Sequence, residues 1–154
     1  MEETPAVVAA RAAGIGFDIV GTDRPNTAEE SARLQGISLR QLLRSIVIRR
    51  GTDDYLFVLV PGDRVISWPK LRNLLGVSRL SMPDAAMAKD ATGYARGTIT
   101  PFGSTRPWPV IADERIRGRR ITLGAGQHGV AVAVDANAAV AALAGEYADV
   151  TDTA

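Results

Sequence analysis

The stretch "SIVIRRGTDDYLFVLVP", residues 45–61, decides the fold class of this chain. Its two runs, residues 45–50 and 55–61, are rich in β-branched, leucine and aromatic side chains, a composition typical of β-strands. The segment "GTDD" between the runs supplies glycine and aspartate, which favour a short hairpin connection. The pattern therefore predicts two neighbouring antiparallel strands.

Helices with marked ends flank this hairpin in the sequence. Thr27 and Glu30 form a capping box for a helix over residues 28–35, and Gly36 suits its C-terminal cap. The stretch "SWPKLRNLLG", residues 67–76, begins with a candidate N-cap serine, has proline in its first turn and ends on glycine. Further helices are predicted over residues 5–13, 83–89 and 136–145, the last one capped by Asp135.

The remaining apolar runs predict more strands. They cover residues 17–20, 78–82, 108–113, 119–126 and 129–134. Strands outnumber the helices that are long enough to be crossovers, and several connections are as short as hairpins. We therefore expect an α+β fold with a mixed, mostly antiparallel sheet and packed helices, in a single domain over residues 1–154.

The composition is that of an ordinary globular protein. The chain has 154 residues, of which 46% are hydrophobic and 23% are charged, and this length suffices for one domain with a real core. The N-terminal stretch "MEETPAVVAARAAG" lacks the basic region and long apolar run of a signal peptide, and no apolar stretch approaches transmembrane length. We expect a cytoplasmic protein with no membrane partner.

The residue types exclude several kinds of site. The chain has no cysteine, and His128 is its one histidine. Disulfides, a thiolate nucleophile and a cysteine- or histidine-rich zinc site are therefore excluded. We expect no cofactor and no metal.

The basic residues are clustered. The formal net charge of +1 argues against a surface that binds nucleic acid over its whole extent. Arginines nevertheless gather in residues 40–50 and 115–120. Such clusters are usually solvated faces, and a local phosphate patch is the alternative, because guanidinium groups offer planar bidentate donors to phosphate oxygens.

The loop "TGYARGTITPFG", residues 92–103, is the strongest candidate for a site. Its three glycines and its proline indicate a shaped backbone, although a plain surface connection is the alternative for such a stretch taken alone. The loop lacks the spacing of a P-loop or of a dinucleotide-binding turn. The spacing Gly97-x-x-x-Pro101 could present backbone N–H groups to a carbonyl or an oxyanion, the electrostatic part of ester hydrolysis.

Two further features carry candidate chemistry. The turn "GAGQHG", residues 124–129, contains His128, which is either a general base or a solvated turn residue. Arg44 stands at the start of an apolar strand, where a snorkelling side chain is the alternative to a functional one.

These segments, in this order, resemble the YbaK-type family of aminoacyl-tRNA deacylases, which includes the editing domain inserted in bacterial prolyl-tRNA synthetases. The resemblance covers nearly the whole chain. Its most specific part is the family block T-G-[YF]-x-x-G-x-x-x-P-x-G. Every fixed position of that block is present, as Thr92, Gly93, Tyr94, Gly97, Pro101 and Gly103.

The resemblance implies where the substrate is held. In the family the Gly-x-x-x-Pro loop lies against the aminoacyl ester at the tRNA terminus, so Gly97 is implied as a catalytic residue. Arg44, which stands at the position of a family lysine, is implied as the second one. The implied substrate-binding residues are Thr27, Gly93, Tyr94, Thr98, Ile99, Pro101, Gly103, Gly126 and His128. The implied partners are the acceptor end of an aminoacyl-tRNA and an aminoacyl-tRNA synthetase.

Two segments depart from the family pattern. The family carries a lysine in "K-[ST]-[LI]-[VF]", where this chain has "RSIV" with Arg44. Many members begin the last turn with Ser-Gly-Gly, where this chain has Gly124, Ala125 and Gly126, although others have an Ala-Gly start with a following histidine, as at Gly126 and His128. Arginine keeps the positive charge but is larger, planar and never usefully deprotonated.

Three functions remain open on this basis. The first is a trans-editing deacylase that hydrolyses the ester of a mischarged tRNA with water as the nucleophile. The second is a catalytically silent module that binds an aminoacyl or nucleotide end, which the replacement of the family lysine motivates. The third is a small-molecule enzyme of unrelated chemistry, which only the glycine-rich loops support.

Overall fold

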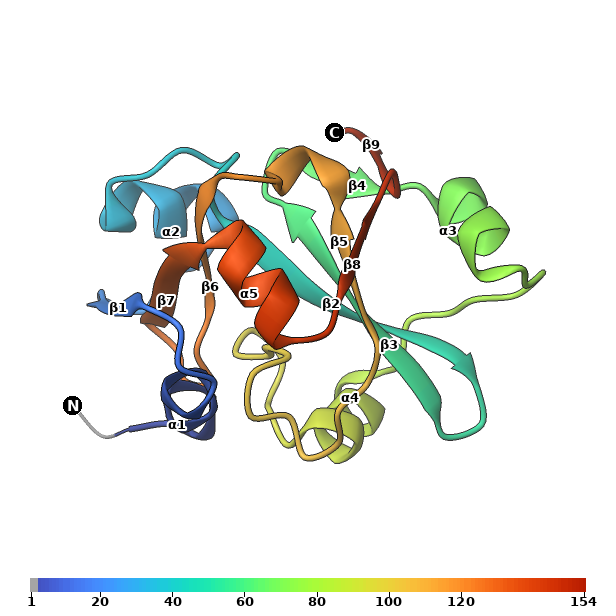
Figure 1. Ribbon diagram of the computed structural model, residues 1–154, viewed down its shortest axis with the longest axis horizontal. Coiled ribbons are helices and arrows are strands. Elements are labelled where there is room, and N and C mark those ends of the chain that lie inside the picture. Colours follow the sequence, from blue (N-terminus) through green and yellow to red (C-terminus); the bar gives the residue numbers. More distant parts are fainter. Residues whose placement is uncertain (1–2) are drawn as a thin grey trace.

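The predicted hairpin forms the centre of the molecule. In the computed structural model, which describes residues 3–154, β2 (Leu43–Gly51) pairs antiparallel with β3 (Asp54–Pro61) (Figure 1). Asp53 turns the chain between them with a positive φ of 52°, which aspartate tolerates better than most residues. β3 is buried from Tyr55 to Pro61, because an apolar cluster covers each of its two faces.

Helices and short strands surround this hairpin. The helices are α1 (Pro5–Ala12), α2 (Ala28–Gln35), α3 (Trp68–Leu75), α4 (Ala85–Thr92) and α5 (Ala136–Ala142), with one 3-10 turn, η1 (Glu114–Ile116). The other strands are β1 (Phe17–Gly21), β4 (Arg64–Ile66), β5 (Val110–Asp113), β6 (Arg120–Gly124), β7 (Val130–Asp135), β8 (Glu146–Ala148) and β9 (Thr151–Thr153). Between residues 3 and 154, no helix combines the length and apolar character needed to cross a membrane.

The strands form three sheets, with orders β1-β7-β6, β2-β3-β5-β8 and β4-β9. Two pairs, β3–β5 and β5–β8, are parallel, and the other pairs are antiparallel. The predicted α+β fold with a mixed, mostly antiparallel arrangement is therefore confirmed. The edge strands β2 and β6 touch at one bridge between Leu42 and Thr122, where the Thr122 N–H donates to the Gln41 carbonyl at 2.8 Å.

The helix ends follow the capping rules. The Thr27 hydroxyl accepts the Glu30 N–H at 3.0 Å, and the Ser67 hydroxyl accepts the Lys70 N–H at 3.4 Å. Gly36 closes α2 in the left-handed conformation, with φ of 71°, which costs a glycine little because it has no Cβ. The predicted ends of α2 and α3 are confirmed.

The strand predicted over residues 78–82 is wrong. Within it, Ser81 alone makes a bridge, exchanging two hydrogen bonds with Arg49 on the outer edge of β2. Pro83 follows and has no N–H to extend the ladder. The strands β4, β8 and β9 were not predicted, because three residues are too few to show a period.

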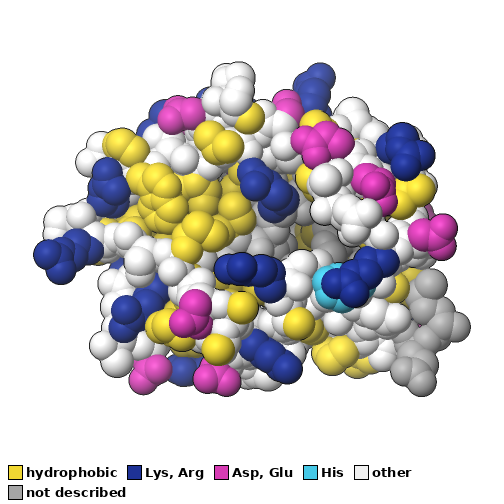
Figure 2. Space-filling model, turned by 180° about the vertical axis from the view of Figure 1, so that it is seen from behind, with side chains coloured by type: hydrophobic (Ala, Val, Ile, Leu, Met, Phe, Trp, Pro, Cys, Tyr) yellow, Lys and Arg dark blue, Asp and Glu magenta, His cyan; other side chains and the backbone are white. Residues whose placement is uncertain are grey.

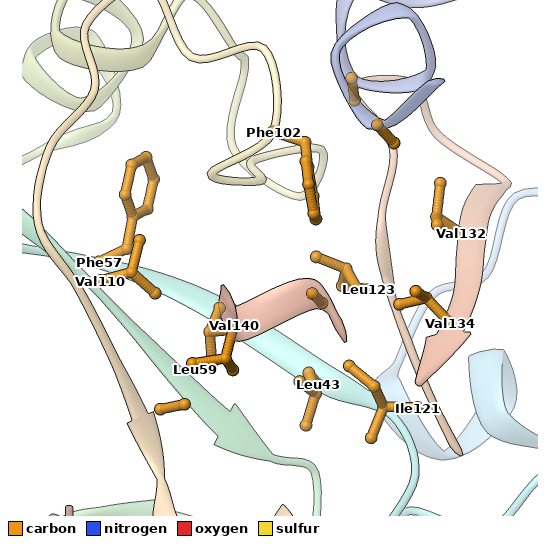
Figure 3. Packing of buried hydrophobic residues seen from close by; sticks show 14 of the residues in the cluster. Leu43, Phe57, Leu59, Phe102, Val110, Ile121, Leu123, Val132, Val134 and Val140 are labelled. Atoms are coloured by element: carbon orange, nitrogen blue, oxygen red, sulfur yellow. The ribbon is translucent and has the colours of Figure 1, made fainter. Parts of the chain in front are cut away.

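The main core lies between the two larger sheets. Figure 3 shows side chains of β2, β3, β6, β7 and α5 pointing into one interior, among them Leu43, Leu59, Leu123 and Val140. Phe102 reaches this interior from the loop after α4. A smaller cluster covers the opposite face of β2 and β3 beneath α3.

A polar network fixes the C-terminal strand. The carboxylate of Asp113 is fully buried and accepts hydrogen bonds from the Arg115 guanidinium and the Thr151 hydroxyl, both at 2.9 Å. Asp149 accepts from the same Arg115 at 2.9 Å and from Lys70 at 3.1 Å, and these two bonds lower the pKa of Asp149 below its usual value. β9 is thereby attached to β5 and α3.

We expect Asp113→Asn to lower the free energy of unfolding by about 1–3 kcal/mol, because the amide removes the buried negative charge that strengthens the hydrogen bonds from Arg115 and Thr151. Asp152→Asn is the matched control, because Asp152 pairs with Lys70 at 3.3 Å while 57% of its side chain is exposed. Exposed pairs contribute about 0–1 kcal/mol. Urea unfolding of both variants and the wild type measures the difference, and equal shifts in the two variants would contradict this role of Asp113.

Candidate functional site

A cavity opens where β2 and β6 separate beyond their single bridge. Its volume is about 850 Å³, within the range of roughly 300–1,000 Å³ that small-molecule sites occupy. The walls are α2, β2, the segment at 82–88, the loop at 96–99, the end of β6 and the turn at 127–129. The cavity therefore lies between two sheet edges.

The edge of β2 offers to this cavity backbone groups that have no partner among the described residues. In an antiparallel strand, alternate residues direct both N–H and C=O to the same side. Arg49 directs its groups outward to Ser81, and Phe57, opposite Val47, donates its N–H away from β2 to Pro109. Ser45 and Val47 alternate in the strand with Arg49 and so point to the same side as it does. Their N–H and C=O groups are therefore directed away from β3, along the cavity wall.

Three side-chain oxygens add to these groups. Ser45 Oγ, Thr122 Oγ1 and Gln35 Oε1 are buried, line the cavity and have no hydrogen-bond partner among the described residues. The Gln35 amide nitrogen is held by the Ser31 hydroxyl at 2.9 Å, which directs the remaining oxygen. Buried polar groups are normally hydrogen-bonded, so these three oxygens are suited to meet a polar ligand or water.

The loop after α4 is built around one tyrosine. Tyr94 is 4% exposed, and its hydroxyl donates to the Phe102 carbonyl at 2.7 Å. Burial raises the pKa of Tyr94 to about 12, so the phenol keeps its proton at neutral pH and acts as a fixed donor. A Cβ at Gly103 would lie 2.7 Å from the Tyr94 hydroxyl, and one at Gly126 would lie 2.6 Å from its ring. These glycines let the backbone pack on the tyrosine.

The tip of this loop is a β-turn that reaches the cavity. Ala95 and Thr98 close the turn, with the Thr98 N–H donating to the Ala95 carbonyl at 3.0 Å. Gly97 occupies the third position with φ of 87°, which a type II turn requires. The N–H groups of Arg96 and Gly97 have no partner within residues 3–154, so both are free to donate.

A second turn of the same design faces the first. Val130 donates to the Gln127 carbonyl at 3.2 Å, and Gly129 holds the third position with φ of 76°. His128 occupies the second position, and a Cβ on Gly97 would lie 3.1 Å from its Cε1 atom. The exposed imidazole therefore rests on Gly97, while no described side chain hydrogen-bonds to it.

Arg44 lies in the cavity wall but is already engaged. Its Nη2 donates to the Arg64 carbonyl at 2.6 Å, which ties the side chain to the start of β4. The side chain is exposed, and its remaining N–H groups are available to a ligand.

The structure divides the residues that the sequence singled out. Those that line the cavity are Thr27, Arg44, Gly97, Ile99 and His128. Those that lie behind its wall or beside it are Gly93, Tyr94, Thr98, Pro101, Gly103 and Gly126. Sequence reasoning missed Arg24, Ser45, Arg96 and Thr122, although the repeated pattern of a basic residue before glycine, in "ARGT" and "QHGV", was a usable signal for Arg96.

The chain belongs to the aminoacyl-tRNA editing domain family, whose sequence profile matches residues 24–141.

Curated relatives include proline–tRNA ligases and a protein named for deacylation. The chain is 30% identical over 100 residues to the proline–tRNA ligase of Thermosipho melanesiensis, covering 65% of this chain and 17% of the ligase. It is 24% identical over 126 residues to EbsC of Enterococcus faecalis, named as a proposed Cys-tRNA(Pro)/Cys-tRNA(Cys) deacylase, covering 81% of this chain and 77% of that protein. The chain thus matches only about 17% of the length of the ligase.

Solved structures share the whole fold. A proposed trans-editing enzyme for prolyl-tRNA synthetase superimposes with a TM-score of 0.86 at 24% identity, covering 96% of this chain and 95% of that one. A protein from work on grafting epitopes onto scaffolds superimposes with a TM-score of 0.88 at 23% identity, covering 97% of this chain and 96% of that one. These similarities show the fold.

Two glycines of the loop should respond differently to an added methyl group. Gly103→Ala should lower the free energy of unfolding by about 2–4 kcal/mol, from a left-handed alanine and from overpacking. Its Cβ would lie 2.5 Å from the Pro5 carbonyl oxygen, a backbone atom that cannot easily move. Gly97→Ala should cost only about 1–2 kcal/mol, the left-handed term alone, because the His128 ring can move aside.

Urea unfolding measures both costs, and NMR reports the imidazole directly because the chain has one histidine. The His128 ring signals should shift in Gly97→Ala and stay in place in Gly103→Ala. An unmoved ring in Gly97→Ala would show that the two turns do not touch in solution.

Proposed function

We propose that this chain is a trans-editing aminoacyl-tRNA deacylase, which hydrolyses the ester of a mischarged tRNA. The observation that carries the proposal is the cavity itself, because it combines unpaired backbone and side-chain donors with an apolar wall. Membership of the editing-domain family and the names of the relatives support the substrate class. The acceptor end of the tRNA is then the ligand, a synthetase is a further partner, and the cytoplasm is the place of action.

The reaction needs positioning more than a side-chain nucleophile. A water molecule attacks the ester carbonyl carbon, the carbonyl oxygen takes the negative charge, and the bond to the ribose oxygen then breaks. The products are the free amino acid and the ribose hydroxyl, which takes up a proton. The free N–H groups of Arg96 and Gly97 are the proposed donors to the developing oxyanion. Such electrostatic stabilisation of the transition state is usually the largest single contribution to catalysis.

The polar oxygens of the opposite wall are suited to hold the water. Ser45 Oγ and Thr122 Oγ1 are both buried and both lack a protein partner among the described residues. A water molecule between them would satisfy two groups that are otherwise costly to leave unpaired. The apolar wall, which includes Ile99 and Leu123, would limit access by other water.

Arg44 is proposed to supply positive charge to this site. Its guanidinium keeps several donors beyond the bond to the Arg64 carbonyl. A charge near the ester or its neighbouring phosphate stabilises the transition state by electrostatics. This role requires the charge of the family's lysine and not its free amine.

We expect Arg44→Lys to keep deacylation activity and Arg44→Ala to lose about 10- to 150-fold in rate, since a charge-assisted hydrogen bond contributes about 1.5–3 kcal/mol. Single-turnover deacylation over a panel of aminoacyl-tRNAs, cysteinyl-tRNA among them, measures the effect. Arg79→Ala is the matched control, because Arg79 is an exposed arginine outside the cavity wall.

The opposite outcome would favour the silent binding module. A wild type that hydrolyses every substrate no faster than Arg44→Ala, while still binding aminoacyl-tRNA, would overturn the deacylase proposal. A gain of activity in Arg44→Lys would then show that the family's chemistry needs the amine.

A further inference from the structure

The cavity is basic on its open side. Arg24, Arg44, Arg96 and His128 line it, and no aspartate or glutamate stands among the described lining residues. Arg44 is bonded to the Arg64 carbonyl. The guanidinium groups of Arg24 and Arg96, by contrast, make no hydrogen bond and no ion pair within residues 3–154. Figure 2 shows Lys and Arg side chains on several sides of the hollow in the middle of this face.

Arg24 and Arg96 flank the same turn. On one side, the Thr22 N–H donates to the Gly129 carbonyl at 2.7 Å, and a Cβ on Gly129 would lie 3.7 Å from the Arg24 nitrogen. On the other side, Gly97, the neighbour of Arg96, touches His128 at the tip of that turn. The two free arginines therefore come from chain segments that hold the turn at 127–130 between them.

The charge at this turn is polarised. Asp23, the neighbour of Arg24, lines a separate shallow groove beyond the turn together with Gly21 and Leu34. His128 and Gly129 border both the groove and the main cavity. A polyanion is therefore drawn to the cavity side of the turn, where the cations are, and away from the groove.

We propose that Arg24 and Arg96 clamp the phosphates of a single-stranded nucleic-acid 3′ end whose terminal nucleoside enters the cavity. The inference rests on the proposed function. It assigns phosphate binding to these two arginines, while Arg44 supplies positive charge near the reacting ester. Guanidinium groups bind phosphate oxygens in a planar bidentate geometry. No ion pair with residues 3–154 has to break first, so the full attraction is available for the ligand.

The test measures binding of a single-stranded RNA oligonucleotide that ends in CCA and carries no amino acid. Arg24→Gln and Arg96→Gln should each weaken binding about tenfold at low salt, the loss expected for one charge-assisted hydrogen bond. Each should also reduce the slope of log K against log salt by about 0.7, the value for one phosphate contact on a single strand. Arg33→Gln, an exposed arginine of α2 outside the cavity wall, is the matched control and should change neither quantity.

A second probe separates phosphate binding from other effects. An oligonucleotide of the same sequence with a neutral methylphosphonate backbone should bind the wild type and both variants equally. Arg96→Lys should keep the salt slope while losing part of the affinity, because the charge remains and the bidentate geometry does not. Thermal melting of each variant shows that the fold is kept.

The inference is overturned if the wild type does not bind the RNA, or if its salt slope equals that of the two glutamine variants. It is also overturned if Arg33→Gln weakens binding as much as they do. The proposed function is judged separately, by hydrolysis of an aminoacyl ester of adenosine that contains no phosphate. If the protein hydrolyses neither that ester nor aminoacyl-tRNA, the deacylase proposal is wrong. The RNA-binding measurements then still decide whether Arg24 and Arg96 bind phosphates.

Discussion

One isolated bridge, between Leu42 and Thr122, joins the edges of the two larger sheets, and in it the Thr122 N–H donates to the Gln41 carbonyl. Because β2 and β6 pair nowhere else in the described chain, they diverge beyond this point. The divergence creates the cavity and leaves the outward groups of Ser45 and Val47 unpaired. A longer ladder would have closed the two sheets on each other and removed the site.

Unpaired strand edges are usually a liability, because they invite pairing with another chain. Here the edge of β2 is limited at both ends, by the bridge at Leu42 and by the contact of Arg49 with Ser81. Between these ends, α2 and the loop at 96–99 cover the edge without pairing with it. The fold thus protects a short stretch of free backbone, which costs stability but supplies fixed donors and acceptors to a ligand.

The parts of the fold that sequence reasoning predicted are those decided by neighbours in the chain. The hairpin and the caps at Thr27 and Ser67 depend on contacts of a few residues, so their patterns are visible in the sequence. The parallel pairing of β5 with β3 and β8 depends on segments about 35 to 50 residues apart, and no local pattern encodes it. The site divides in the same way: the glycine block was recognisable, but the partnerless oxygens of Ser45 and Thr122 arise only where two distant strands separate.

The two facing turns explain why glycine is needed at position 97 for more than one reason. The turn requires a positive φ there, which asparagine or aspartate would also tolerate. The His128 ring, however, has its Cε1 atom only 3.1 Å from the position of a Cβ, so a side chain at position 97 would displace the ring. Backbone conformation and close approach therefore coincide at one residue. Since Arg96 precedes this glycine and His128 opposes it, the distance between the two turns also sets the spacing of the basic groups at the mouth of the cavity.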